Sequence, residues 1–337
     1  MKKSELVQQI LGSHFGKVPE NHRTAEAFAP SNIALCKYWG KRDTDLNLPL
    51  TSSLSVALPA FGSHILLSVN SDKKDEIILN DSPVQSDTQF YRRFIDYINL
   101  FRPKLSWYFK AVIHSTVPVS AGLASSASGF ASLVLALNQL FEWQFDRRQL
   151  SVLARLGSGS ACRSLWDGFV EWQAGVRADG MDSHGVPLEQ IWPDLCLGLL
   201  IFSVDAKPIS SREAMQRTVQ TSRLYRDWPA QVSSDMEKIK KAIREKNFLL
   251  LGESAEANAI AMHATMADAI PGISYALPET KTSIQKIRQM RDEGISVYFT
   301  QDAGPNLKLI FLRQDMPDIS RCFPGLQVVQ LFSAGTF

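Results

Sequence analysis

The stretch that most constrains the fold is residues 117–130, with the sequence VPVSAGLASSASGF, which leads into the apolar, helix-compatible segment ASLVLALNQLF. A turn rich in Gly and Ser before a helix presents unpaired backbone N–H groups at the positive end of the helix dipole. Such a turn favours phosphate binding, and the pattern is neither a Walker loop nor a Rossmann turn. It predicts a phosphate-binding loop, with close packing of a small-residue helix start as the alternative.

The size and composition of the chain limit its class. Its 337 residues predict two domains, which we expect to span 1–192, beginning with a short polar extension at 1–24, and 193–337. Apolar residues at 45% and charged residues at 21% are typical of a soluble globular protein. A net charge of +2 gives no reason to expect nucleic acid or an anionic membrane as a partner, so an anionic ligand requires a local site.

The termini and cysteines indicate a cytoplasmic protein. The N-terminal segment does not read as a signal peptide, and the most apolar run, LCLGLLIF, is too short to cross a bilayer. The cysteines include no C-x-x-C pair, which argues against a disulfide framework or a zinc site and fits a reducing compartment. They are Cys36, Cys162, Cys196 and Cys322.

Hydrophobic periodicity predicts alternating strands and helices, and therefore an α+β sandwich. In the first domain, 64–69 reads as an edge strand with 75–79 as its hairpin partner. We also expect helices at 90–101 and 147–156 and strands at 107–113 and 169–172. In the second domain we expect helices at 230–246, 248–264 and 278–293 and strands at 195–204, 296–300, 307–312 and 326–332. Ser210 is expected to be the N-cap of a further helix.

Two segments carry cations suited to an anion. Lys37, Tyr38 and Lys41 lie on a Gly-containing loop, although a solvated basic turn is favoured from this segment alone. Arg163 lies among small residues that include Ser158 and Ser160. Its planar guanidinium suits a carboxylate or phosphate, and pairing with a structural Asp or Glu is the alternative.

Asp302, in the turn QDAGPN, is either a functional carboxylate or a turn aspartate that caps its own backbone. His263 is expected to be structural, since no histidine has a partner at a useful spacing. Because no carboxylate or histidine cluster suggests a metal site, any metal is expected to arrive with a nucleotide.

Several short sequence blocks that contain these residues together resemble one protein family. APSNIALCKYWGKRD with LPLTSSLS, SAGLASSASG, GSGSACRSLWDGFVEW, SSREAMQ, MHATMADAIPGISY and DAGPN occur in this order. They resemble diphosphomevalonate decarboxylases, members of the GHMP kinase superfamily, over about residues 27–335. KYWGKRD and GSGSACRS are specific to the family, whereas GLASSASG is shared across the superfamily.

The resemblance implies a GHMP kinase fold, with an N-terminal domain like ribosomal protein S5 domain 2 and a ferredoxin-like C-terminal domain. The active site is expected in the cleft between them. The implied reaction uses ATP and Mg²⁺ to phosphorylate the tertiary 3-hydroxyl of mevalonate 5-diphosphate. Loss of phosphate and carbon dioxide then yields isopentenyl diphosphate, in the mevalonate pathway of isoprenoid biosynthesis. A cytoplasmic homodimer is also implied.

The same resemblance assigns roles by position. Asp302 matches the catalytic aspartate, Arg163 the arginine that holds the substrate carboxylate, and Asn32 a third catalytic position that supports Arg163 or the substrate. The other matched positions are substrate-binding Tyr38, Lys41, Ser158, Ser160 and Ser211, and nucleotide-binding Gly122, Leu123, Ala124, Ser125, Ser126 and Lys207, with Ser126 also facing magnesium. An exposed aspartate with a pKa near 4 is a weak base, so we expect Asp302 to act by orientation and electrostatics.

The chain departs from the family pattern at Gln301 and at Val119-Ser120, and neither change removes a chemical role. Three alternatives remain: a kinase that stops at phosphorylation, a decarboxylase of the monophosphate, and a catalytically inactive metabolite sensor. A sensor should have lost Asp302 or the loop serines, which are present.

Overall fold

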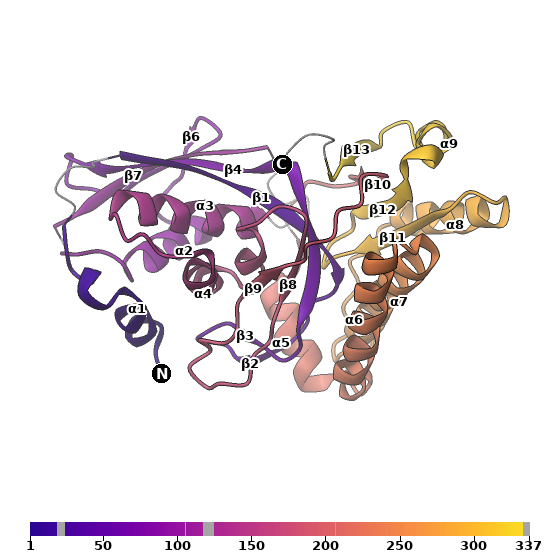
Figure 1. The fold of residues 1–337 in the computed structure, drawn as a ribbon, viewed down its shortest axis with the longest axis horizontal. Coiled ribbons are helices and arrows are strands. Elements are labelled where there is room, and N and C mark those ends of the chain that lie inside the picture. The colour runs from indigo at the N-terminus through magenta and orange to yellow at the C-terminus, as the bar shows by residue number, and fades with distance from the viewer. Residues whose placement is uncertain (19–23, 105, 117–124, 206, 333–337) are drawn as a thin grey trace.

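The computed structural model describes residues 1–18, 24–104, 106–116, 125–205 and 207–332. Two α/β parts lie side by side, and each is built on a sheet (Figure 1). The predicted phosphate-binding residues Gly122, Leu123 and Ala124 lie outside the described residues.

The first sheet has seven strands in the order β6-β5-β7-β4-β8-β9, with β1 paired to β4. Its bounds are β1 (Thr24–Cys36), β4 (Ser53–Asn70), β5 (Glu76–Leu79), β6 (Ser82–Pro83), β7 (Tyr108–Ser115), β8 (Phe169–Trp172) and β9 (Gly185–Pro187). A separate small hairpin joins β2 (Lys41–Asp43) to β3 (Leu48–Pro49).

The prediction that residues 64–69 form an edge strand is wrong. They belong to the 18-residue strand β4, which lies between β1 and β7 at this point. The predicted hairpin of 64–69 with 75–79 is also wrong, because β5 pairs with β7 in parallel. Alternation of polar and apolar residues reports one buried face, and it does not identify the neighbouring strand.

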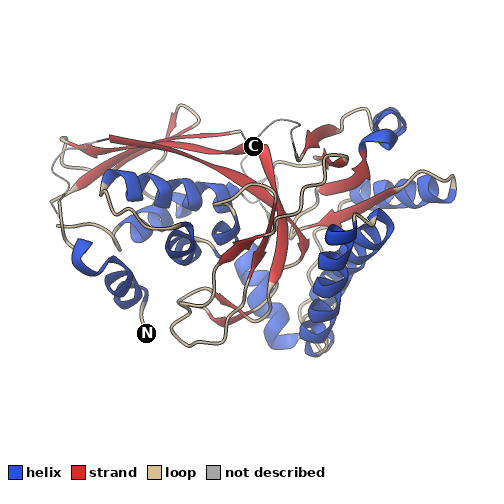
Figure 2. Cartoon of the chain, viewed as in Figure 1, coloured by secondary structure: helices blue, strands red, loops and turns tan. Residues whose placement is uncertain are grey.

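Helices cover one face of the outer part of the first sheet (Figure 2), whereas β1 also contacts α6 (Trp228–Glu245) and α7 (Phe248–Ala267) of the second part, and β4 contacts α6. The covering helices are α2 (Gln89–Ile98), α3 (Ser125–Leu140) and α4 (Arg147–Gly157), followed by the short 3-10 helix η2 (Gly159–Arg163). Small residues in α3 allow it to lie close against β1 and β4.

The N-terminal segment is more than a polar extension. Residues Lys3–Leu11 form α1, followed by the 3-10 helix η1 (Gly12–His14), and α1 contacts α4. The prediction is corrected because Leu6, Val7, Ile10 and Leu11 are buried in the same core as α3 and α4.

The second sheet is antiparallel, in the order β11-β12-β10-β13. Its strands are β10 (Leu195–Leu200), β11 (Val297–Gln301), β12 (Leu307–Leu312) and β13 (Gln327–Gln330). The predicted strand 195–204 ends earlier because Asn306 Oδ1 accepts the N–H groups of Phe202 and Ser203 and turns the chain away.

The helices of the second part are α5 (Ser211–Thr221), α6 (Trp228–Glu245), α7 (Phe248–Ala267), α8 (Pro278–Asp292) and α9 (Met316–Cys322), with 3-10 helices η3 (Leu224–Arg226) and η4 (Arg313–Asp315). The three helices predicted in this part, at 230–246, 248–264 and 278–293, correspond to α6, α7 and α8. Ser210 accepts the N–H of Glu213 and is the predicted N-cap of α5. Within the described residues, no helix is both long enough and apolar enough to span a membrane.

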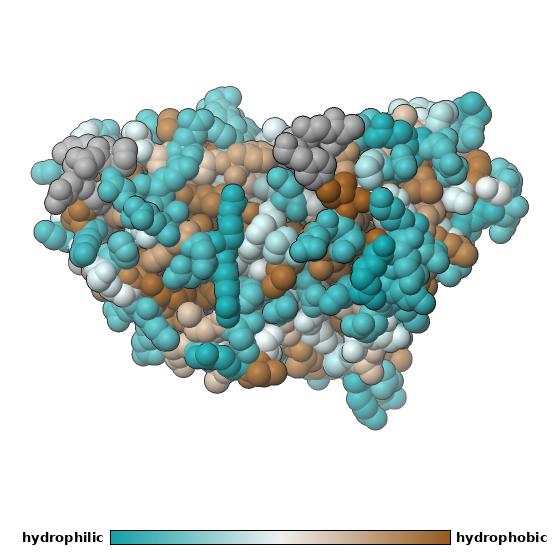
Figure 3. Space-filling model, viewed as in Figure 1, coloured by the Kyte–Doolittle hydropathy of each residue, from teal (hydrophilic) through white to brown (hydrophobic). Residues whose placement is uncertain are grey.

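The two parts share a continuous core. Ile33 and Val56 of the first sheet belong to the same buried cluster as Ile239 of α6 and Leu251 of α7. The predicted domain boundary at 192/193 precedes the first strand of the second sheet by two residues and stays a prediction. The face of the molecule in Figure 3 is mostly hydrophilic, with hydrophobic side chains between the polar ones.

Candidate active site

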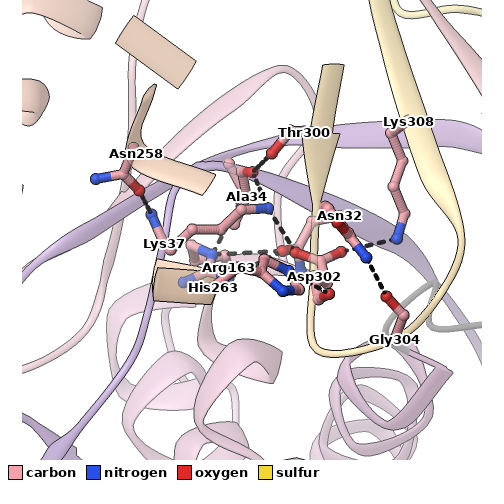
Figure 4. A network of polar contacts seen from close by, with 12 residues as sticks. Asn32, Ala34, Lys37, Arg163, Asn258, His263, Thr300, Asp302, Gly304 and Lys308 are labelled. Carbon is pink, nitrogen blue, oxygen red and sulfur yellow. Dashed lines mark hydrogen bonds and ion pairs between the residues drawn. The ribbon is translucent and has the colours of Figure 1, made fainter. Parts of the chain in front are cut away.

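Asp302 lies where the two parts of the chain meet. It follows β11, and the pairing of Thr300 with Lys308 brings Lys308 of β12 next to it. One carboxylate oxygen is 2.7 Å from Nζ of Lys37, and the other is 3.1 Å from Nζ of Lys308 (Figure 4). Gln301, which departs from the family pattern, donates to the carbonyl of Gly304 and holds the turn.

These lysines determine the ionisation of Asp302. Its side chain is 25% exposed, whereas those of Lys37 and Lys308 are 2% and 1% exposed. Burial alone raises the pKa of Asp302, but Lys308 and Lys37 outweigh burial and hold the pKa well below its usual range. The expectation of an exposed aspartate with a pKa near 4 is therefore corrected, and the carboxylate is ionised at neutral pH.

Neighbouring groups fix this ion pair in place. Lys37 Nζ also donates to the carbonyl of Ala34 at 2.9 Å, and its backbone N–H donates to Asn258 of α7 at 2.7 Å. Burial lowers the pKa of His263 to about 4, and Nε2 of His263 lies 3.2 Å from the carbonyl of Asp302. His263 is thus neutral and holds the backbone, in agreement with its expected structural role.

Arg163 is a buried cation on the other side of the site, 2% exposed. Its guanidinium donates to Ser53 Oγ, to Ser55 Oγ at 3.0 Å and to Asn32 Oδ1 at 3.2 Å. No described carboxylate lies within ion-pair distance of it, so the alternative of a structural Asp or Glu partner is wrong. Burial lowers the pKa of this guanidinium, and only neutral oxygen atoms among the described residues accept its hydrogen bonds, so an anionic ligand can supply the missing charge.

Asn32 is hydrogen-bonded to Arg163. Its Oδ1 accepts from Arg163, and its Nδ2 donates to Ser164 Oγ at 2.8 Å and to the carbonyl of Ser160 at 3.3 Å. The amide is thereby oriented with its oxygen toward the guanidinium. Three segments distant in sequence are joined at this point.

The KYWGK loop is anchored against the second part of the chain. The carbonyl of Trp39 accepts from Tyr225 Oη at 3.0 Å and from Trp228 Nε1 at 2.9 Å. Gly40 has φ of 115°, and a Cβ there would overlap the Tyr225 hydroxyl. Tyr38 is packed edge-on against Trp172, and its buried Oη has no partner among the described residues. A solvated basic turn is therefore the wrong interpretation of this loop.

Hydroxyl groups link α3 to the loop after α4. Ser126 Oγ lies 3.3 Å from Ser158 Oγ, which lies 3.3 Å from Ser160 Oγ. Lys207 Nζ donates to Ser211 Oγ at 3.3 Å, at the start of α5. Ser125 begins α3, but its side chain lies outside the described set.

These residues line one cavity of about 350 Å³. Its described lining contains one carboxylate, that of Asp302, against six cationic side chains: Lys37, Lys41, Arg93, Arg163, Lys207 and Arg212. The predicted residues that line it are Asn32, Tyr38, Lys41, Ser126, Ser158, Ser160, Arg163, Lys207, Ser211 and Asp302. The excess of positive charge suits a ligand with several anionic groups.

The roles of four cations near the site were not predicted from the sequence. Lys37 was expected on an anion-binding loop, but its pairing with Asp302 was not predicted. Lys308 was missed although it is a lone charge in the apolar strand LKLIFL, a pattern typical of a buried, paired lysine. Arg93 lies in none of the recognised blocks, whereas Arg212 lies in the block SSREAMQ but was given no role, and the fold brings both to the cavity.

A second cavity, of about 290 Å³, adjoins the first at Arg93 and Ser126. It lies beside the start of α3, and its walls include Phe90, Phe94 and Phe130. An apolar, aromatic-lined cavity next to a cationic one suits a ligand with a flat ring system at one end and phosphates at the other.

Comparison with known proteins identifies the family. The sequence model "Diphosphomevalonate decarboxylase-like N-terminal domain" matches residues 29–185, and "Mevalonate 5-diphosphate decarboxylase C-terminal domain" matches residues 198–330. The chain belongs to the diphosphomevalonate decarboxylase family. The diphosphomevalonate decarboxylase of Candida albicans is 38% identical over 305 residues, covering 86% of this chain and 84% of that protein. That of Saccharomyces cerevisiae is 38% identical over 312 residues, covering 87% and 78%.

Solved structures of the family have the same fold. Mevalonate diphosphate decarboxylase from Staphylococcus aureus matches with a TM-score of 0.86 and 34% identity, over 93% of this chain and 97% of that one. MDDEF in complex with MVAPP, the ATP analogue AMPPCP and magnesium matches with a TM-score of 0.85 and 35% identity, over 91% and 96%. The predicted GHMP kinase fold, with its two-domain arrangement, is confirmed.

Proposed function

We propose that this chain catalyses the ATP-dependent decarboxylation of mevalonate 5-diphosphate to isopentenyl diphosphate, ADP, phosphate and carbon dioxide, within the mevalonate pathway. The observation that carries this proposal is one ionised carboxylate, Asp302, sharing a cationic cavity with the unpaired Arg163. A phosphoryl acceptor and a substrate carboxylate need different partners, and the cavity offers one for each. Membership of the family supports the same reaction.

Asp302 orients the 3-hydroxyl of the substrate toward the phosphoryl donor. Because Lys37 and Lys308 keep its pKa low, the carboxylate stays ionised and can accept a hydrogen bond from the hydroxyl, but it is a weak base that retains a proton poorly. Its contribution is therefore alignment of the hydroxyl before phosphorylation. Once the 3-phosphate departs, the same negative charge stabilises the positive charge that develops at the tertiary carbon.

Arg163 holds the substrate carboxylate. An ion pair that only stabilised the bound carboxylate would slow its loss, because a lower ground state raises the barrier. Arg163 instead contributes by orienting the substrate. Ser53, Ser55 and Asn32 fix the guanidinium, and the fixed guanidinium aligns the C–CO2 bond with the departing phosphate.

The diphosphate end of the substrate binds where Lys41 and Arg212 line the cavity, with Tyr38 Oη, Ser158 and Ser160 as hydrogen-bond donors. The buried, unpartnered hydroxyl of Tyr38 fits such an acceptor. Lys41 and Arg212 carry two positive charges without an ion-pair partner among the described residues. These two charges favour the diphosphate over the monophosphate as substrate.

The nucleotide binds between the two cavities. Its base fits the aromatic-lined cavity beside α3, and its phosphates pass Ser126, Arg93 and Lys207. No described group of three or more His, Cys, Asp or Glu side chains forms a metal site. Ser126 would face a magnesium ion bound together with ATP, and that ion would supply charge neutralisation during phosphoryl transfer.

The deciding experiment incubates the protein with ATP, magnesium and either mevalonate 5-diphosphate or the 5-monophosphate. ADP, phosphate, carbon dioxide and the alkenyl product are measured in each reaction. Equal amounts of ADP and carbon dioxide from the diphosphate alone are expected. ADP without carbon dioxide would instead favour a kinase, and turnover of the monophosphate would favour the second alternative.

We further propose that the protein acts in the cytoplasm as a homodimer. The described cysteines are all free thiols, which fits a reducing compartment. The homodimer is supported by the family resemblance alone. Light scattering with size-exclusion chromatography tests it, and a mass near 37.6 kDa would contradict it.

A further inference from the structure

Lys41 has an unusual partner for a cation in a substrate cavity. Its Nζ donates to Oδ1 of Asn47 at 2.6 Å, and no described carboxylate lies within ion-pair distance of it. An amide oxygen carries only a partial negative charge, so it orients an ammonium group without neutralising it. The full positive charge of Lys41 remains available to a ligand.

Asn47 is itself held rigidly. It is 2% exposed, and its Nδ2 donates to the carbonyls of Arg155 at 2.9 Å and Leu156 at 3.2 Å. Both carbonyls belong to the last turn of α4, where backbone oxygens lack partners within the helix. The backbone of Asn47 has φ of 53°, a conformation that asparagine adopts more readily than most residues.

The contact between this turn and α4 is reciprocal. Arg155, which is fully buried, donates through Nε to the carbonyl of Leu46 at 3.1 Å. The N–H of Leu46 donates to Asp43 Oδ1 at 2.8 Å and closes the turn between β2 and β3. Ser158 and Ser160 follow α4 directly. The end of this helix therefore sets the position of both Lys41 and the two serines.

Neighbouring cations repel Lys41, so the lysine needs a fixed hydrogen-bond acceptor to stay in the cavity. Burial lowers the pKa of Lys41 to about 8, with further lowering by Arg212, Lys3 and Arg93. These three charges come from α5, α1 and α2 and repel the ammonium group. A flexible lysine without a fixed acceptor would move away from them and toward solvent.

We propose that Asn47 is a positioning residue that holds the charged Lys41 in place for the diphosphate end of the substrate. The inference rests on the proposed role of Lys41 in binding the diphosphate. It adds a residue that acts through Lys41 and explains why an amide, and not a carboxylate, occupies position 47.

A double-mutant cycle tests this directly, with binding of mevalonate 5-diphosphate measured by calorimetry. We expect Asn47→Gly, which tolerates the positive φ, to weaken binding about tenfold, the scale of one charged hydrogen bond. Lys41→Met should weaken binding by at least as much, and adding Asn47→Gly to it should have little further effect. The KM for ATP should stay unchanged in all three variants.

Two further variants complete the design. Asn47→Asp keeps the side-chain size and should pair with Lys41, so its binding should be as weak as that of Lys41→Met. Asn99→Gly is the matched control, because the exposed Asn99 also accepts from a cation, Arg102, at 2.7 Å outside the cavity. Binding in this control should equal that of the wild type.

The outcomes separate the two proposals. Normal binding by Lys41→Met would refute the role of Lys41 in the proposed function. Weak binding by Lys41→Met, with a full additional tenfold loss on adding Asn47→Gly, would leave that role intact and overturn the positioning role of Asn47.

Discussion

Replacing Asp302 with Asn tests the centre of the proposed mechanism. The carboxylate lies 2.7 Å from Lys37 and 3.1 Å from Lys308. An asparagine of the same shape can accept from one lysine, but its NH2 group then faces the other. We therefore expect both a slower reaction and a less stable protein.

The effect on stability follows from burial. Breaking a buried ion pair costs about 3 to 5 kcal/mol, and because Asp302 is 25% exposed we discount this to about 2 to 4 kcal/mol. The folded pKa of Asp302 is depressed, so its contribution is present above the unfolded value near 4 and is lost as the pH falls. The stability difference between wild type and variant should be largest at neutral pH and shrink below pH about 4.

The effect on turnover is larger. Loss of a charge aimed at a developing cation, together with lost alignment, should reduce kcat by roughly 10³- to 10⁵-fold. Release of ADP and carbon dioxide measures turnover, and calorimetry with ATP should give nearly unchanged affinity. Asp318→Asn is the matched control, since Asp318 pairs with Arg321 on the surface at 2.9 Å. Near-normal turnover of Asp302→Asn, with its fold intact, would refute the reasoning.

Three more predictions concern the other charged and hydroxyl groups. Arg163→Ala should reduce the rate of decarboxylation at saturating substrate by about 10²-fold or more. Arg163→Lys should recover little of this rate, because lysine cannot reproduce the planar contacts to Ser53, Ser55 and Asn32. An unchanged rate in Arg163→Ala would contradict its role in binding the carboxylate. Ser126→Ala should raise the KM for ATP and magnesium several-fold with little change in the KM for the diphosphate substrate, and equal changes in both would oppose the nucleotide assignment. Because the pKa of Lys41 is lowered to about 8, the residue loses its charge as the pH rises through that value, so the KM for substrate should rise above pH 8. In Lys41→Arg this rise should disappear, since arginine stays protonated, and its persistence would assign the titration to another group.

The sequence predicted the chemistry of the site better than its electrostatics. Arg163 and Asp302 stand in patterns whose residue types already imply an anion site and a functional turn. The pKa of Asp302 depends on Lys37 and Lys308, which are 265 residues and 6 residues away along the chain. Only the register of β11 with β12 and the meeting of β1 with the second part bring them together.

The fold was predictable where periodicity is local. The predicted helices at 230–246 and 278–293 lie within two residues of α6 and α8 at each end. Strand neighbours were not predictable, because β4 pairs with β1 along most of its length and with β8 and β7 at its two ends. The helix α1 could have been recognised from the spacing of Leu6 with Ile10 and of Val7 with Leu11, which places all four on one face.

Asp302 is paired with one lysine from each part of the chain, and this limits how the two parts can be exchanged between relatives. Lys37 belongs to the first part of the chain, whereas Asp302 and Lys308 belong to the second. In a chimera that joins this second part to a first part lacking the lysine, Asp302 would keep only one of its two cationic partners, and its pKa would be higher. Lys37 and Lys308 should therefore be transferred together in any such chimera, as one inherited unit with the aspartate between them.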